Sequence, residues 1–211
     1  MMVRKSDENE EKDPIDQAAD ATAAAPKAAR GKRAAAPADD DPLQARLQRA
    51  DEMAEAGHNT EAAEAYSAVL AASADNLRAL VGLGGVLAAQ GKYDAAEKEL
   101  RRALKVAPDS PELNVQLGIT LYKKGVYAAA ATALRRAIEL DPESAVARVV
   151  LGEALNQMAE SEAALEVLEE AVRLAPENAR AYYAMGIAYD RKGNPERAAE
   201  MYRLSRESAG R

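Results

Sequence analysis

Apolar residues recur at the spacing of amphipathic helices from residue 43 to the end of the chain. Leu80, Leu83 and Leu87 form one such stretch, and Leu100 and Leu104 belong to the next. Steps of three and four residues place apolar side chains on one face of a helix. The pattern therefore predicts successive helices that each bury one face.

Breaks between these stretches have the residues of helix ends. Gly91 stands between the two stretches named above, and glycine readily takes the left-handed conformation that ends a helix. Pro108 follows the second stretch, and proline cannot continue a helix. The order predicted is a helix, a tight turn, a second antiparallel helix and a stop.

This helix pair repeats with a period of 34 residues. The step is kept by Gly84, Gly118, Gly152 and Gly186, by Ala62, Ala96, Ala130, Ala164 and Ala198, and by Pro108, Pro142 and Pro176. Five copies are predicted, at 43–76, 77–110, 111–144, 145–178 and 179–211. One such pair cannot bury its apolar face alone, so neighbouring copies are expected to stack into a solenoid.

The third copy, PELNVQLGITLYKKGVYAAAATALRRAIELDPES, resembles the tetratricopeptide repeat. The Leu117-Gly118 pair, Gly125, Ala130 and Pro142 occupy the places that the family pattern requires. The resemblance covers about four fifths of the chain. It implies an all-α, right-handed solenoid. It implies less about function, because this fold serves many unrelated partners.

Residues 1–42 differ in composition from the repeats, since they mix charged residues, alanine and proline with few large apolar side chains. Such a segment cannot bury enough surface to offset the entropy of ordering, so it is predicted to be disordered. Lys27, Arg30, Lys32 and Arg33 lie close together within it. They form either a contact patch for an acidic partner or membrane, or part of a solvated linker.

Composition narrows the class of protein. The 211 residues include no cysteine and one histidine, which excludes a disulfide framework, a thiolate nucleophile and a cysteine-type zinc site. The net charge of −7 argues against nucleic-acid binding. No stretch approaches the roughly 20 continuous apolar residues of a membrane span. We therefore expect a soluble cytoplasmic protein, and the alanine- and arginine-rich usage favours a bacterial one.

The glycine-rich stretch GLGGVLAAQGK, residues 82–92, resembles a phosphate-binding loop only at first sight. From Gly85, five residues rather than four precede the Gly-Lys pair, and Tyr93 stands where a serine or threonine should hold magnesium. A dinucleotide-binding loop fails as well, because Leu87 takes the place of its third glycine. The glycines are instead assigned to packing and to the surface of a helix.

No group of residues has the pattern of a catalytic site. His58 lies in a predicted turn without a triad around it, and Glu166, Glu169 and Glu170 are expected on a solvated helix face. We predict no catalytic residues, no metal site, no cofactor and no enzymatic activity.

In proteins with this repeat, the first helices of the copies line a concave groove that binds ligands. Carrying those positions over gives a predicted protein-binding groove of Val81, Gly85, Ala88, Val115, Gln116, Ile119, Tyr122, Val149, Asn156, Arg180, Tyr183 and Ile187. Exposed together, the apolar members would form a patch large enough to mark an interaction site. The alternative is that neighbouring helices cover several of them.

Some family members grip terminal carboxylates with a clamp of Lys, Asn and Arg, and the matching positions here lack that set. The partner predicted instead is a helix or extended segment with apolar anchors, guided by Gln116, Asn156 and Arg180. The function expected is that of an adaptor or scaffold. Two alternatives stay open: a self-assembling structural oligomer that uses the same groove, and a regulatory subunit of a larger complex.

Overall fold

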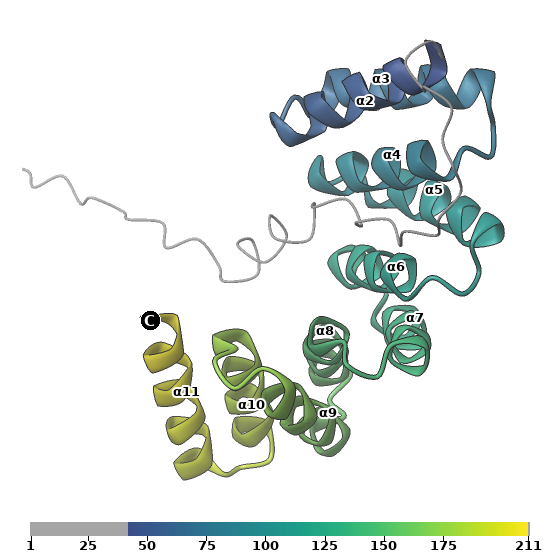
Figure 1. Cartoon of the computed structure of the whole chain (residues 1–211). Coiled ribbons are helices and arrows are strands. Elements are labelled where there is room, and N and C mark those ends of the chain that lie inside the picture. The colour runs from purple at the N-terminus through teal and green to yellow at the C-terminus, as the bar shows by residue number, and fades with distance from the viewer. Residues whose placement is uncertain (1–41, 211) are drawn as a thin grey trace, which may run out of the picture.

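The structure is a computed structural model that describes residues 42–210, and this part of the chain forms ten α-helices and no strand (Figure 1). The predicted all-α solenoid is confirmed. Two predictions concern the tail at residues 1–42: its disorder and its basic cluster. Apart from Pro42, these residues lie outside the described part of the chain. The helices are α2 (Pro42–Glu55), α3 (Asn59–Ala72), α4 (Leu77–Ala89), α5 (Tyr93–Val106), α6 (Pro111–Lys124), α7 (Tyr127–Leu140), α8 (Ala145–Gln157), α9 (Ser161–Leu174), α10 (Ala179–Arg191) and α11 (Pro195–Ala209).

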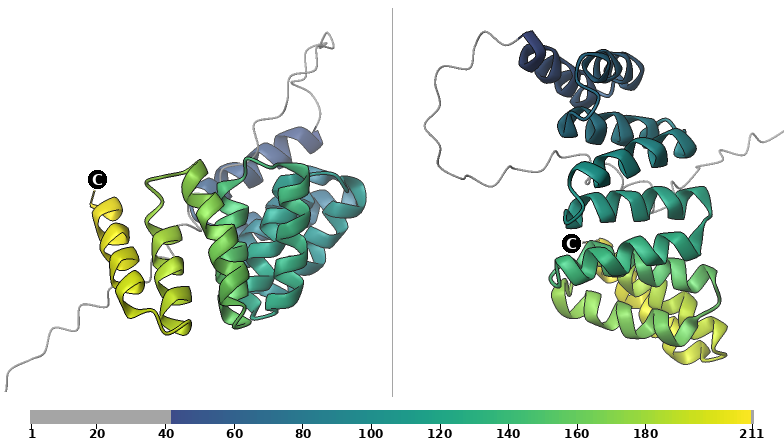
Figure 2. Two further views of the ribbon diagram at one scale, coloured as in Figure 1. Left: turned by 90° about the horizontal axis from the view of Figure 1, so that it is seen from below. Right: turned by 90° about the vertical axis from the view of Figure 1, so that its right-hand side faces the viewer.

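The helices stack in chain order into a curved array whose two ends lie apart (Figures 1 and 2). Each helix packs against the next, and each even-numbered helix also contacts the following even-numbered helix. The even-numbered helices therefore line the inner side of the arc, which we call the concave face. Packing runs unbroken from one pair to the next, so the limits proposed for the five copies stay a prediction.

Polar caps begin the inner even-numbered helices. Asn76, Ser110, Ser144 and Asn178 precede α4, α6, α8 and α10, and each side chain accepts a hydrogen bond from the backbone N–H three residues later. Such caps satisfy one of the free N–H groups at a helix start. Because they recur every 34 residues, they start the helices of the concave face at equivalent positions.

The turns within the pairs use the left-handed backbone that the sequence predicted. Gly91 and Gly125 have φ angles of 72° and 85°. Ala159 occupies the equivalent place in the fourth pair with φ 61°, although an alanine side chain is strained in that region. The chain keeps the turn there at the expense of backbone strain.

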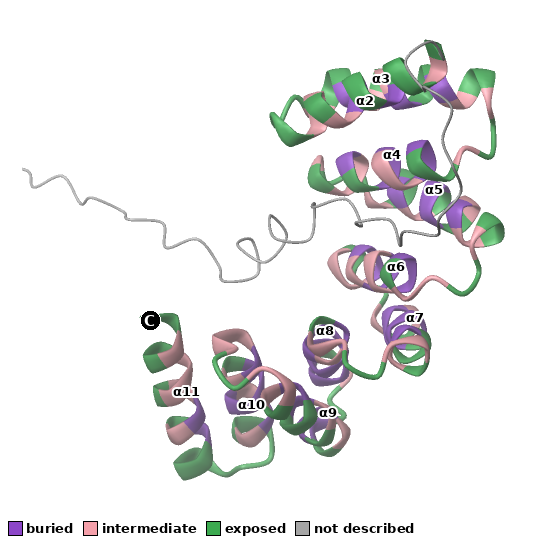
Figure 3. Cartoon of the chain, in the orientation of Figure 1, coloured by how far each residue is buried: buried purple, intermediate pink, exposed green. Residues whose placement is uncertain are grey.

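The core lies where neighbouring helices meet, as the buried positions in Figure 3 show. Gly118 illustrates why glycine recurs inside the pairs. A Cβ atom built on it would lie 2.5 Å from Cγ of Leu134, which is fully buried. Gly84, Gly152 and Gly186 meet the side chain sixteen residues later in the same way. The packing role predicted for Gly84 is confirmed, and the other three glycines share it. Within residues 42–210, no helix has the length and apolar character needed to cross a membrane.

Candidate protein-binding face

The structure places the twelve predicted groove residues on four even-numbered helices but exposes them unequally. Gly85 and Tyr183 are exposed. A second group is half-buried: Val81, Ala88, Val115, Gln116, Ile119, Tyr122, Arg180 and Ile187. Val149 and Asn156 are each only 2% exposed.

Val149 was expected to offer an apolar side chain to a partner, and that expectation is wrong. It lies within the hydrophobic core, against which Val115 and Ile119 are also packed. Tyr183 holds the equivalent position in the last pair and is 48% exposed. The difference arises because another helix pair follows Val149 and none follows Tyr183 within the described residues.

On the concave face, neighbouring copies form ion pairs between residues that lie 27 positions apart in the sequence. Asp51 pairs with Arg78 across α2 and α4, and the Tyr66 hydroxyl donates to the same carboxylate at 2.5 Å. At the other end, Glu153 on α8 pairs with Arg180 on α10. These two ion pairs occupy equivalent positions in the repeat.

In the copies between these two ion pairs, the equivalent residues do not carry opposite charges. Ile119 on α6 and Val146 on α8 are equivalent to Glu153 and Arg180, and Val146 is 43% exposed. On α4 the position is Gly85, where a Cβ atom would have nothing within 4 Å. We call Val81, Gly85, Val115, Ile119 and Val146 the central stripe. It is a partly exposed apolar surface with an open trough at Gly85, and it lies between the two ion pairs. The exposed Glu112 lies at its edge, at the position equivalent to Val146 and Arg180.

Gly82 does not belong to that trough, although its sequence position places it beside the groove. A Cβ atom at Gly82 would lie 2.3 Å from the Tyr66 ring. This glycine is required for packing against α3, so the open surface on α4 is confined to Gly85 and its neighbours.

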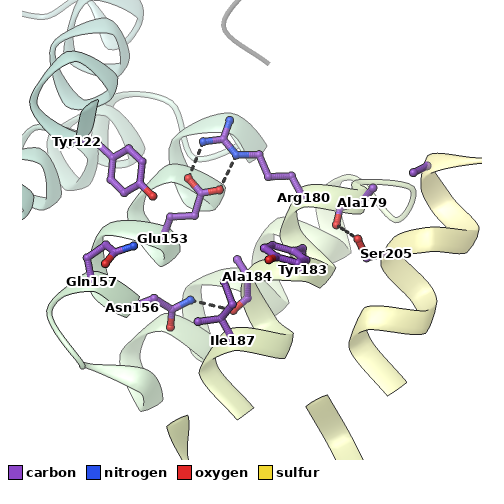
Figure 4. Close-up of a pocket in the computed structure, with 11 residues that line it drawn as sticks. Tyr122, Glu153, Asn156, Gln157, Ala179, Arg180, Tyr183, Ala184, Ile187 and Ser205 are labelled. Carbon is purple, nitrogen blue, oxygen red and sulfur yellow. Dashed lines mark hydrogen bonds and ion pairs between the residues drawn. The ribbon is translucent and has the colours of Figure 1, made fainter. Parts of the chain in front are cut away.

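Arg180 was expected to guide a partner, but Glu153 already binds its guanidinium (Figure 4). The Nε–Oε1 and Nη2–Oε2 distances are both 2.5 Å, and the Glu153 side chain is 10% exposed. A two-point pair of this kind fixes both side chains. Arg180 therefore holds α10 against α8, and its guanidinium is not available as a binding group for an anionic ligand.

A hollow of about 150 Å³ opens beside this ion pair, where α6, α8, α10 and α11 approach one another. It brings together five of the predicted residues: Tyr122, Asn156, Arg180, Tyr183 and Ile187. Beyond the twelve residues predicted for the groove, the lining comprises Glu153, Gln157, Ala179, Ala184, Ser205 and Ala209. Figure 4 shows the tyrosines and the ion pair around it.

Asn156 and Ser205 tie the helices of the hollow together. The Asn156 side-chain nitrogen donates to the Ala184 carbonyl at 2.8 Å, and the Ser205 hydroxyl donates to the Ala179 carbonyl at 2.8 Å. The Ser205 hydroxyl thus joins α11 to the start of α10.

Two tyrosine rings give the hollow its aromatic character. Tyr183 packs against Tyr202 with 5.5 Å between ring centroids, and Tyr122 packs against Tyr127 at 5.6 Å. Burial raises the pKa of Tyr122 above its ordinary value, and the nearby Glu153 carboxylate raises it further. A hydrogen bond from Gln157 and the charge of Arg180 oppose these effects. The Tyr122 hydroxyl thus stays neutral at physiological pH.

His58 and the acidic residues of α9 lie apart from this face. His58 is exposed in the turn before α3, and Glu166, Glu169 and Glu170 are exposed on α9. In the part of the chain that the structure describes, no three histidine or acidic side chains are grouped as metal ligands would be.

Comparison with known families agrees with the stacked pairs. Tetratricopeptide repeat models match residues 53–116, 152–193 and 181–206. The chain is a tetratricopeptide repeat protein. A model of anaphase-promoting complex (cyclosome) subunit 3 matches residues 89–171. No curated protein sequence matches the chain significantly.

Solved tetratricopeptide repeat structures share this arrangement. A crystal structure of MamA is 29% identical, with a TM-score of 0.71, and the match covers 76% of this chain and 94% of that one. YrrB, described as a TPR protein with an unusual peptide-binding site, is 25% identical with a TM-score of 0.67, and the match covers 77% of this chain and 84% of that one. MamA from Desulfovibrio magneticus RS-1 matches at 24% identity with a TM-score of 0.75, covering 80% and 96%, and supports the fold alone.

Proposed function

We propose that this protein is a non-catalytic adaptor that holds a helix or extended segment of a partner protein against its concave face. The central stripe supplies the apolar anchor site. The observation that carries the proposal is the partly exposed apolar surface between two ion pairs whose charges already satisfy each other, with Gly85 and Val146 as its exposed members. A continuous apolar surface that is open to solvent favours protein binding.

The relatives support the same reading. YrrB is described as having a peptide-binding site, and it matches this chain over 77% of its length. The central stripe offers an apolar surface with Gln116 beside it, which suits an amphipathic helix or an extended segment. We also propose that the protein is bacterial and acts in the cytoplasm, as expected from its composition.

The first test fills the trough at Gly85. Since a Cβ atom there has open space within 4 Å, Gly85→Leu should fold normally while its side chain occupies the anchor site. Ala95→Leu adds the same side chain at an exposed position on α5 and serves as the control. Circular dichroism should show equal helical content for all three proteins.

The readout is affinity capture from the native cell by the immobilised full chain, followed by quantitative mass spectrometry. We expect proteins bound by wild type and by Ala95→Leu to be depleted at least tenfold with Gly85→Leu. Equal recovery by all three proteins would refute the assignment of the central stripe.

Light scattering of the full chain and of residues 43–211 separates this proposal from self-assembly. The first helix opposes end-to-end stacking, because α2 exposes Arg49 and Glu52 at the places where the fourth copy buries Leu151 and Ala154. The adaptor account predicts the monomer mass of 22.4 kDa for the full chain. A stable multiple of that mass that is lost in residues 43–211 would favour the oligomer.

A further inference from the structure

Polar side chains of the hollow are already bonded within the protein. Glu153 and Arg180 neutralise each other through two hydrogen bonds. The Asn156 amide nitrogen and the Ser205 hydroxyl each donate to a backbone carbonyl of α10 at 2.8 Å, and the remaining oxygen of Asn156 is closed off from solvent. A charged or polar ligand group would lose its water on entry without gaining new partners here, which costs free energy. The hollow therefore favours an uncharged, apolar group.

The walls that remain for contact are aromatic and aliphatic. Tyr122 lines the hollow from α6, and Tyr183 and Ile187 line it from α10. Gln157 already donates a hydrogen bond to the Tyr122 hydroxyl, so the ring is the surface that this tyrosine offers. The volume of the hollow is about 150 Å³, and an apolar cavity of about 150 Å³ accepts a benzene ring. Aromatic rings also pack favourably against one another, edge to face or offset. The size and the walls of the hollow thus suit a phenyl ring.

The chain has no aromatic side chain of its own that is free to fill the hollow. It contains no phenylalanine and no tryptophan, and all eight tyrosines lie in the described helices. The tail at residues 1–42 contains none of these three residue types, so it cannot supply the ring, either within one molecule or to a second copy. Tyr122 follows Ile119 by one turn of α6, which places the hollow next to the central stripe. A segment of another protein that runs along the concave face could reach both.

We propose that the hollow binds the phenyl ring of a phenylalanine in the partner segment. The ring packs against Tyr122 and Tyr183, and the rest of the segment continues over the central stripe. The inference rests on the proposed function, because it identifies one anchor residue of the segment held on the concave face. It assigns that anchor to a protein other than this one.

The test titrates the full chain with four N-acetyl amino-acid amides, those of phenylalanine, leucine, lysine and glutamate. NMR signals of the Tyr122 and Tyr183 rings report binding. We expect saturable shifts with the phenylalanine derivative, and binding of the leucine derivative weaker by about two- to tenfold because it lacks a ring. The lysine derivative should cause no saturable shift. The glutamate derivative should cause none either, although Arg206 lies beside Tyr183 in a neighbouring depression. Equal or tighter binding of any other derivative, or no shift with the phenylalanine derivative, would overturn the proposal.

Variants then identify the groups responsible. Tyr183→Leu keeps an apolar side chain but removes the ring, so it should weaken binding of the phenylalanine derivative by about two- to tenfold and abolish its advantage over leucine. Tyr93→Leu on α5, outside the hollow, should leave both unchanged.

A charge placed in the hollow gives a second, independent result. Ile187→Glu should abolish binding of the phenylalanine derivative, whereas Val106→Glu, at a side chain of α5 that is 44% exposed, should not. Circular dichroism should show equal helical content for both variants and wild type. Unchanged binding by Tyr183→Leu or by Ile187→Glu would contradict the proposal. Failure here leaves the capture experiment at Gly85 intact, so the two proposals fail separately.

Discussion

Arg180 and Glu153 join α10 to α8 through a two-point ion pair with both N–O distances at 2.5 Å. The two side chains keep only 18% and 10% of their exposure. Removing one partner strands the other charge in a poorly solvated place. We therefore expect Arg180→Met to lower the free energy of unfolding by about 2 to 4 kcal/mol, and Glu153→Met with Arg180→Met to recover most of that loss. Urea denaturation measures both.

Arg78 provides the matched control for that pair, since it contacts Asp51 at the equivalent position but is 55% exposed. Solvent screens an exposed pair, so Arg78→Met should lower the free energy of unfolding by about 1 kcal/mol or less. A single Arg180→Met variant as stable as the double variant would show that Glu153 is not stranded by the loss of its partner.

Ala159 tests the strain in the turn between α8 and α9. Its φ of 61° lies where the other pairs have glycine, and an alanine there costs roughly 1 kcal/mol. Ala159→Gly should raise the free energy of unfolding by about 1 kcal/mol and the Tm by about 2 to 4 °C, measured by thermal denaturation. The reverse change, Gly125→Ala, should lower stability by a similar amount. A Tm for Ala159→Gly at or below that of wild type would disprove the strain.

Gly118 and Gly85 have different surroundings: Gly118 packs closely against a neighbouring helix, whereas Gly85 lies on open surface. A methyl group at Gly118 would meet Leu134, so Gly118→Ala should lower the free energy of unfolding by about 1 to 3 kcal/mol. Gly85→Ala meets nothing within 4 Å and should raise it by about 0.5 to 1 kcal/mol, because alanine favours helix more than glycine. Chemical denaturation of the two variants should give opposite signs, and the same sign for both would refute the packing assignment.

Lys124 links α6 to α5, and this contact predicts a pH dependence. Its ammonium donates to Glu97 at 2.9 Å and lies 2.6 Å from Asp94. Hydrogen bonds from Lys124 and then Arg101 hold the pKa of Glu97 below its usual range. A lowered carboxyl pKa stabilises the folded state above the unfolded value of about 4.3, and this stabilisation is lost as the pH falls through the folded pKa.

The Lys124→Met variant should accordingly melt below wild type at pH 7, and the difference in Tm should shrink as the pH falls below about 4. Thermal denaturation between pH 7 and pH 3 follows it, with Lys98→Met as a control on the exposed face of α5. A difference in Tm that stays constant across this range would exclude the Glu97 contact as its source.

Much of the fold follows from the sequence because each copy repeats the same local signals. Asn76 and Ser110 begin equivalent helices, and Gly91 and Gly125 end equivalent turns, so the 34-residue period is visible before any packing is known. Local backbone preference and apolar spacing act within one copy. The positions and the order of the helices can therefore be predicted from the sequence of each copy.

The concave face was harder to predict because burial there depends on the neighbouring copy. Val149 and Tyr183 have the same place in the repeat, yet one is buried and the other is half exposed. A signal for the missed contacts does exist in the sequence. Opposite charges 27 residues apart, such as Glu153 and Arg180, meet across neighbouring copies, as Glu97 does with Lys124.

Photo-crosslinking from the central stripe tests the account most directly. A benzoylphenylalanine placed at Gly85 has open space on the concave face, and one at Ala95 lies exposed on α5 as the control. In the native cell, the account predicts that the probe at residue 85 crosslinks to a single segment of a partner protein and that the probe at residue 95 does not. Equal crosslinking from both positions, or none from residue 85, would contradict the claim that the concave face holds a partner.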